Sequence, residues 1–187
     1  MRDLRISLQF AAFITMFLFM ACTSTSTKFS TIWKDETYQG HPKKILVINM
    51  FQNPSIRRLF EDEIVKAMKD RKVDAVVKYS VVPPDTVVSD KDAVAALAKE
   101  VGADTVLITR PAGTRQDVTG SLTGTAISSV YINIQTDVYD MKTNKLISFA
   151  SAETKIKMDS PDLQHYLNSV PAYVKDLVNK LSQTGLF

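Results

Sequence analysis

The sequence predicts an α/β fold, in which residues 29–187 form one domain around a mixed sheet. Three apolar runs alternate with two amphipathic helical patterns, and this order favours parallel strands joined by right-handed crossovers. An alternating apolar-polar segment and its returning partner come next, and they favour an antiparallel hairpin. A C-terminal helix completes a two-layer or three-layer sandwich. The composition, 45% hydrophobic and 23% charged, allows the core that such a domain needs.

The first strand and helix follow an aromatic arm, residues 29–42, that holds the only tryptophan, Trp33. A large aromatic side chain in such an arm is expected to pack on the domain. The apolar run 45–50 is bounded by turn residues and predicts a strand covered on both faces. Asn53 and Pro54 then supply an N-cap and a proline at the first helical position.

This first helix is predicted to run to about Lys72. Its apolar residues fall on one stripe at helical spacing: Ile56, Leu59, Phe60, Ile64, Ala67 and Met68. Two charged pairs, each four residues apart, are expected on the outer, solvated face: Arg57 with Glu61 and Arg58 with Asp62. Three consecutive acidic residues, 61–63, diverge around the helix, so they are not expected to act as a catalytic carboxylate pair.

The second strand is predicted over the valine-rich segment 74–82, which two prolines close. Asp90 can cap a second helix, and Gly102 stands at the carboxyl end of that helix. The run 104–110 then predicts the third strand. These elements together give the order strand, helix, strand, helix, strand.

Beyond residue 110 the pattern changes. Glycines space out a polar segment, 111–129, which predicts a strand-like excursion that is either mobile or bulged. Segment 130–139 alternates apolar and polar residues, and segment 145–157 returns beside it, so the two predict a hairpin. A serine-proline pair at 160–161 opens the C-terminal helix, which Pro171 is expected to kink or split.

Residues 1–21 predict a secretory signal peptide. Two arginines precede an apolar run, 6–21, that is shorter than the roughly 20 residues of a membrane-spanning helix. A secreted or single-pass anchored structural protein is the alternative. A cut after Ala21 by the general signal peptidase would place bulky Phe19 where a small residue is wanted.

The residues before the only cysteine resemble a bacterial lipobox. The family pattern is leucine, two small residues and cysteine, and Ala21 with Cys22 matches its last two positions. Phe19 and Met20 depart from the pattern, and Leu18 lies one place early. The resemblance implies cleavage between Ala21 and Cys22, and acylation of Cys22 with several lipid chains that anchor it stably to a bilayer. A free cysteine is the alternative, although an unpaired thiol is unfavourable in an oxidising compartment.

The polar residues 22–28 predict a flexible tether between the lipid and the domain. In the lipoproteins that this segment resembles, an aspartate after the lipidated cysteine favours retention in the inner membrane. Thr23 stands in that place here. The resemblance therefore implies the periplasmic side of the outer membrane.

The sequence offers few groups for catalysis. It contains two histidines and one cysteine, and the assignment of Cys22 to the anchor leaves the domain without a thiol. Neither histidine has a second ligand at metal-binding spacing, no phosphate-binding loop is present, and segment 120–124 places its serine one position too early for a nucleophile elbow. No cofactor or metal is expected, and a periplasmic hydrolase or other small-molecule enzyme is the less favoured alternative. A net charge of +3 is too small to predict nucleic-acid binding.

Two short motifs resemble an uncharacterised family of small bacterial periplasmic lipoproteins. They are Gly102, Ala103, Asp104, Val106 and Leu107 in the third strand, and Tyr139, Asp140, Lys142, Thr143, Lys145 and Leu146 at the hairpin turn. The layout is similar to that of the TolB amino-terminal domain and of the curli-secretion and penicillin-binding-protein-activator lipoproteins. This resemblance implies a fold more than a function, and it implies no catalytic residue.

We therefore predict a non-enzymatic binding or assembly module for an envelope protein or another envelope component. The candidate surfaces are one face of the sheet, the excursion 111–129 and the outside of the first helix. The charged residues expected to contact a partner are Arg57, Arg58, Glu61, Arg110 and Arg115.

Overall fold

The computed structural model describes residues 26–83, 86, 88, 90–120, 126–158 and 163–187. The predicted signal peptide, with its cleavage and lipidation site at Ala21 and Cys22, lies outside the described residues. The serine-proline pair expected to open the last helix, at 160–161, lies outside them as well.

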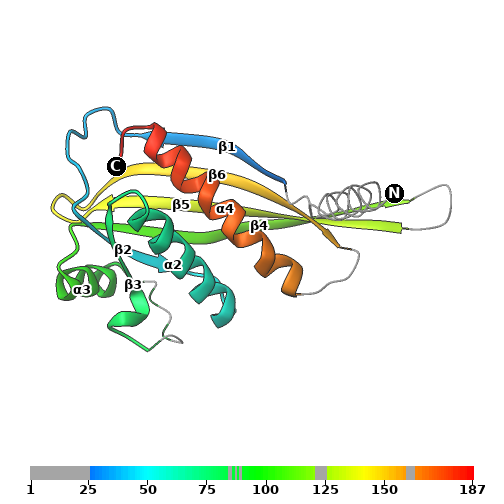
Figure 1. The fold of residues 1–187 in the computed structure, drawn as a ribbon, viewed down its shortest axis with the longest axis horizontal. Helices are drawn as coiled ribbons and strands as arrows, with labels where there is room; N and C mark the ends of the chain where they lie inside the picture. The colour runs from blue at the N-terminus through cyan, green and yellow to red at the C-terminus, as the bar shows by residue number, and fades with distance from the viewer. Residues whose placement is uncertain (1–25, 84–85, 87, 89, 121–125, 159–162) are drawn as a thin grey trace, which may run out of the picture.

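One six-stranded mixed sheet organises the domain, in the order β1-β6-β5-β4-β2-β3 (Figure 1). Its strands are β1 (Ser26–Lys34), β2 (Lys44–Asn49), β3 (Asp74–Val77), β4 (Thr105–Gly120), β5 (Ala126–Asp140) and β6 (Lys145–Met158). The helices are α2 (Pro54–Lys69), α3 (Lys91–Val101) and α4 (Leu163–Gln183), with a 3-10 turn at Lys78–Ser80. β2 pairs in parallel with β3 and β4, and the other neighbouring strands pair antiparallel. The predicted α/β fold class is confirmed.

The helices cover the two faces of the sheet unequally. α2 and α4 pack on one face, to which Ile45 and Val47 of β2 contribute their side chains. α3 packs on the other face, against Leu46 and Ile48 of β2 and against Val106 of β4. No described helix covers β5, β6 and β1 on that second face (Figure 1). The domain therefore has three layers beside α3 and two layers elsewhere.

The predicted caps at the amino ends of α2 and α3 and at the carboxyl end of α3 are confirmed. The Asn53 side chain accepts hydrogen bonds from the amides of Ser55 at 2.9 Å and Ile56 at 3.2 Å, which starts α2. Asp90 caps α3 in the same way at 3.0 Å. Gly102 ends α3 in the left-handed region at φ +67°, where a residue without a Cβ is unstrained.

The amino-terminal arm is a strand, and this corrects the predicted tether. β1 begins at Ser26, so residues 26–28 belong to the sheet and not to a flexible link. β1 pairs antiparallel with β6, with Ile32 opposite Ala150 and Trp33 opposite Phe149. The alternation along β1 therefore turns Ile32 toward α4 and Trp33 away from it.

Two other boundaries differ from the prediction. β3 ends at Val77 because the 3-10 turn follows directly, and α2 ends at Lys69, before Lys72 takes a positive φ of 64°. α4 continues through Pro171 as one helix. The described part of the excursion is the bulged strand that the sequence predicts: β4 and β5 remain paired up to residues 120 and 126, with a register shift between Pro111 and Gly113.

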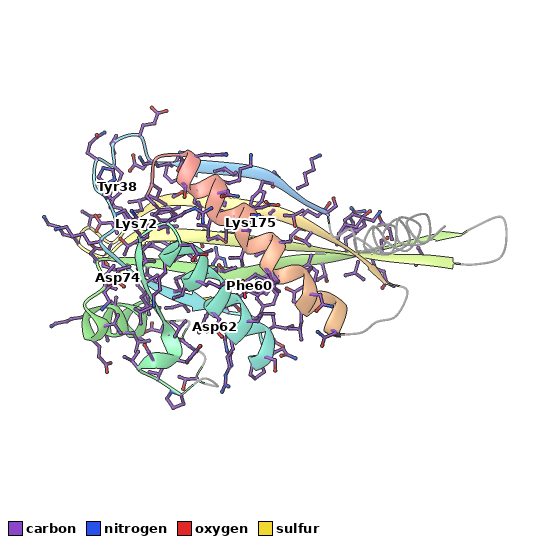
Figure 2. All side chains as sticks on the ribbon, in the orientation of Figure 1. Tyr38, Phe60, Asp62, Lys72, Asp74 and Lys175 are labelled. Atoms are coloured by element: carbon purple, nitrogen blue, oxygen red, sulfur yellow. The ribbon has the colours of Figure 1, made fainter. Side chains whose placement is uncertain are left out.

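An aromatic cluster joins α2, α4 and the end of β2. The ring of Phe60 lies 5.0 Å from that of Phe51, 5.7 Å from that of Tyr173 and 6.5 Å from that of Tyr166. Phe60 is 1% exposed and lies where α2 faces α4 (Figure 2). Buried aromatic pairs at these distances stabilise beyond the area they remove from water. This cluster therefore fixes the two helices together on one face.

Truncation of Phe60 tests this packing. Phe60→Ala is expected to lower the free energy of unfolding by about 3–5 kcal/mol, because it leaves a cavity among three other rings. Leu59→Ala, at the partly buried neighbouring position of the same helix, is the matched control and is expected to lower it less. Urea denaturation measures both values, and equal losses would contradict the packing described.

Candidate functional site

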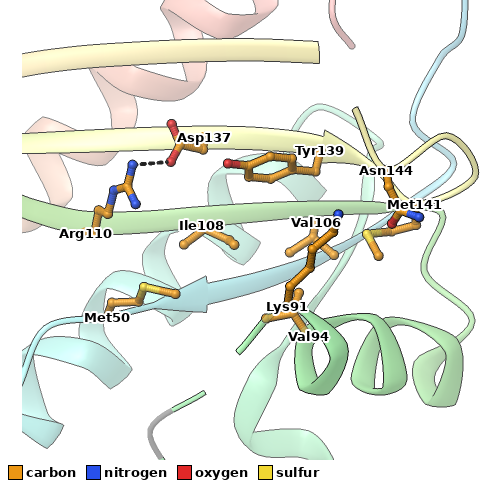
Figure 3. Close-up of a pocket in the computed structure, with 10 residues that line it drawn as sticks. All are labelled: Met50, Lys91, Val94, Val106, Ile108, Arg110, Asp137, Tyr139, Met141 and Asn144. Atoms are coloured by element: carbon orange, nitrogen blue, oxygen red, sulfur yellow. Dashed lines mark ion pairs between the residues drawn. The ribbon is translucent and has the colours of Figure 1, made fainter. Parts of the chain in front are cut away.

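A cavity of about 280 Å³ lies between the amino end of α3 and the sheet (Figure 3). Its described lining residues are Met50, Lys91, Val94, Val106, Ile108, Arg110, Asp137, Tyr139, Met141 and Asn144. They come from the end of β2, from α3, from β4 and β5, and from the hairpin turn. Ligands of α/β sheets commonly bind beyond the carboxyl ends of parallel strands, and Met50 stands directly after β2. The cavity is therefore a candidate binding site.

An ion pair forms one wall of this cavity. Arg110 Nη2 lies 3.0 Å from Asp137 Oδ2, and Gln135 Nε2 donates to Asp137 Oδ1 at 2.9 Å. The side chain of Asp137 is 4% exposed, whereas that of Arg110 is 45% exposed. Both carboxylate oxygens of Asp137 are thus occupied, while the guanidinium stays open to solvent. Burial and the Asp137 carboxylate raise the pKa of Tyr139, so this phenol keeps its proton at neutral pH.

Lys91 supplies a second cation. Its side chain extends from the first turn of α3 across the cavity, toward the side on which Met141 and Asn144 lie (Figure 3). It forms no ion pair with any residue that the structure describes. Since Asp137 is the only acid among the described lining residues, the lining carries one uncompensated positive charge.

The lining suits binding better than acid–base or nucleophilic chemistry. No serine, histidine or cysteine occurs among its described residues. The charge of Asp137 is compensated by Arg110, which makes it a weak general base. No group of three metal-ligating side chains occurs within the described parts of the chain. The described helices also include none that is long and apolar enough to cross a bilayer.

The second candidate site is the face of β4, β5, β6 and β1 that points away from α2 and α4, here called the open face. Trp33 is 44% exposed on it, opposite Phe149. Further along, the guanidinium of Arg115 lies 4.0 Å from the centre of the Tyr131 ring, and Lys155 Nζ lies 5.4 Å from it. These cation–π contacts hold two cations over one aromatic ring.

Acidic side chains lie beside the same cations. Arg115 pairs with Asp117, and its Nη2 lies 3.6 Å from Glu153. Exposed ion pairs of this kind contribute little to stability, so their groups can exchange partners at little cost. The open face therefore combines aromatic area with mixed charge.

Arg57 and Glu61 do not belong to a surface, and their predicted solvated position is wrong. They are 3% and 1% exposed. The Glu61 carboxylate accepts from the amide of Asn49 at 3.0 Å, and Arg57 Nη1 donates to the carbonyl of Phe51 at 3.3 Å. The buried stripe of α2 is Arg57, Phe60, Glu61, Ile64, Val65 and Met68, about one position away from the predicted stripe. Burial raises the pKa of Glu61 to about 7, although the Asn49 amide and the charges of Lys78 and Arg57 oppose this.

The other predicted partner residues are exposed, but they do not form one site. Arg110 lines the cavity, Arg115 lies on the open face, and Arg58 lies on α2. Sequence reasoning missed Lys91 and Asp137. These two residues line the same cavity as Arg110 only because tertiary packing brings their segments together. The signal for Asp137 was available in the alternation of β5, which places it on the polar side of that strand.

Comparisons with known proteins support the fold. Neither a protein-family model nor a curated protein sequence matches the chain. Among solved structures, the PelC dodecamer from Paraburkholderia phytofirmans is 11% identical, with 84% of this chain and 97% of that chain covered and a TM-score of 0.50. Lipoprotein GNA1162 from Neisseria meningitidis is 12% identical, with coverage of 76% and 99% and a TM-score of 0.49. A minor lipoprotein from Acinetobacter baumannii is 11% identical, with coverage of 77% and 95% and a TM-score of 0.41.

The chain is therefore similar in fold to solved bacterial proteins, two of which are lipoproteins. At these identities the likeness defines the arrangement of strands and helices, and it transfers no residue. The class that the fold defines is a small α/β domain built on one mixed six-stranded sheet.

The buried carboxyl group of Glu61 predicts a pH-dependent stability. Its folded pKa of about 7 lies above the ordinary value of 4.5, so the folded state holds its proton more tightly than the unfolded state. The resulting stabilisation is complete below pH 4.5 and is lost as the pH rises to about 7, by at most about 3 kcal/mol. Glu61→Gln is expected to remove this part of the pH dependence.

Urea denaturation between pH 4.5 and 8 measures the effect as the difference between the wild-type protein and the variant. Glu63→Gln, on the same helix, is the matched control. If wild type and Glu61→Gln show parallel stability curves over this range, the buried and proton-binding position of Glu61 is wrong.

Proposed function

We propose that this chain is a lipid-anchored, non-enzymatic binding module of the bacterial envelope, tethered through Cys22 to the periplasmic side of the outer membrane. The open face of its sheet receives a protein of the envelope. The observation that carries this proposal is the exposure of aromatic and cationic side chains on a sheet face that no described helix covers.

An open sheet face alone is common, since antiparallel sheets often face water on one side. The residue composition of this face distinguishes it from an ordinary solvated sheet face. Tryptophan, tyrosine and arginine are the residues that most often dominate the affinity of protein interfaces. The open face carries Trp33 at one end and Tyr131 with Arg115 at the other, so it offers two anchoring points for a partner.

The small number of residues between Cys22 and β1 supports a short tether. Three residues separate Cys22 from the start of β1 at Ser26, and the four steps from one Cα atom to the next span at most about 14 Å. Ser26 lies opposite Lys155, which in turn lies opposite Tyr131. The Tyr131 end of the open face is therefore the end near the membrane, and the Trp33 end points away from it. A partner bound across this face would lie beside the module and not between the module and the lipid.

The anchor predicts the fractionation of the protein. Cys22→Ser cannot be acylated, so the protein is expected to move from the membrane fraction to the soluble periplasmic or cytoplasmic fraction. Ser24→Ala, two residues on, is the matched control and is expected to remain with membranes. Mass spectrometry of the mature amino-terminal peptide detects the lipid on Cys22 directly. An unmodified thiol at Cys22, or a Cys22→Ser protein that still fractionates with membranes, would refute the anchor.

The open face predicts a partner that depends on Trp33. Trp33→Ala is expected to weaken partner capture by roughly tenfold or more, because exposed tryptophans at interfaces contribute more than most contacts. Mild crosslinking in native membranes followed by purification measures the captured protein. Lys175→Ala, on the exposed side of α4, is the control and is expected to leave capture unchanged (Figure 2). Equal capture by wild type and Trp33→Ala would count against the open face.

A further inference from the structure

We infer that the cavity beside α3 binds a small amphipathic anion, namely a carboxylate carried on a compact apolar body. This site adjoins the open face, but its lining includes none of the residues proposed to anchor an envelope protein, namely Trp33, Tyr131 and Arg115. The inference rests on three properties of the lining: its apolar floor, its uncompensated positive charge and its size.

The floor of the cavity is apolar. Val106 of β4 is 0% exposed and Val94 of α3 is 7% exposed, and Ile108 lies beside them as a partly buried residue. Met50 and Met141 stand at two sides of the same cavity. Methionine side chains adapt to differently shaped apolar groups, so these two can close on a ligand body. Removal of this apolar surface from water provides the main driving force for binding.

The charge of the lining selects an anion. Lys91 has no ion-pair partner among the described residues, and Arg110 shares its charge with Asp137 through Nη2 alone. Asp137 accepts a hydrogen bond from Gln135 at Oδ1 and forms an ion pair with Arg110 at Oδ2, so its negative charge is already neutralised within the lining. An anionic group in the cavity, by contrast, can pair with the ammonium group of Lys91, whose side chain extends across the cavity. Tyr139 keeps its proton and adds a neutral hydrogen-bond donor to the same lining.

The size of the cavity limits the ligand. A volume of about 280 Å³ lies just below the range of small-molecule pockets, which begins near 300 Å³. A single ring or a short branched chain with one carboxylate fits this volume, whereas a phospholipid with two acyl chains does not. The ligand class is therefore a small apolar monocarboxylate.

Methyl NMR of the full-length protein in a non-ionic detergent tests the inference. Cyclohexanecarboxylate is the probe, and cyclohexylmethanol has the same ring without the charge. In protein labelled at the methionine methyl groups, the signals of Met50 and Met141 are expected to shift on addition of the carboxylate. Met68, which is fully buried in the core on the other face, is the internal reference and is expected not to shift.

Variants of α3 test the role of charge. Lys91→Ala is expected to weaken carboxylate binding roughly three- to fivefold, and Lys91→Glu is expected to weaken it further. Lys99→Ala, at an exposed position in the last turn of the same helix, is the control and is expected to bind as wild type does. Because Lys91 is exposed, none of these variants removes core packing, and the Met68 signal confirms the fold.

Three outcomes would overturn the inference. In the first, the Met50 and Met141 signals do not respond to cyclohexanecarboxylate at concentrations up to the millimolar range. In the second, cyclohexylmethanol binds as tightly as the carboxylate, which would remove the selection for an anion. In the third, Lys91→Glu binds the carboxylate as wild type does. None of these outcomes bears on the Trp33→Ala experiment, so the two proposals fail separately.

Discussion

The packing of α2 and α4 on one face of the sheet is the constraint on which the other features depend. The ring cluster around Phe60 and the small residues Ala150 and Ala152 of β6 let α2 and α4 lie close to the strands. A helix is about 10–12 Å wide and covers roughly two strands that lie 4.8 Å apart. α3 therefore covers β2 and β4 on the opposite face and leaves β5, β6 and β1 without a described helix above them. The open face and the cavity both lie where α3 ceases to cover the sheet.

The two candidate sites are continuous across β5. Asp137 forms a wall of the cavity, and in the register of the sheet it stands opposite Phe149, which stands opposite Trp33. A ligand beside α3 therefore lies next to the row of side chains that includes Phe149 and Trp33, which belong to the surface proposed for a protein partner. This arrangement connects a small-molecule site and a docking surface through the ion pair of the exposed Arg110 with the buried Asp137. The buried charges of α2 lie on the other face and take no part in either site.

The local signals in the sequence predicted most of the fold, and the nonlocal contacts account for the differences. Asn53, Asp90 and Gly102 act within a few residues of themselves, so the helix ends could be predicted. β1 could not be recognised, because its only partner is β6, more than a hundred residues away in the chain. Arg57 and Glu61 were placed outside on account of their charge, although their spacing relative to Phe60 and Ile64 fits the buried stripe. The cavity depends on four separate segments, and no local pattern reports how they meet.

The most direct measurement of the central claim is a photo-crosslinking comparison of the two faces in intact bacteria. A photoreactive amino acid replaces Ser151 on the open face in one protein and Asp176 on the exposed side of α4 in another. If the open face is the binding surface, position 151 gives a discrete adduct with an envelope protein and position 176 gives none. Adducts from position 176 alone, or equal adducts from both positions, would contradict the claim that the face opposite α2 and α4 is the binding surface.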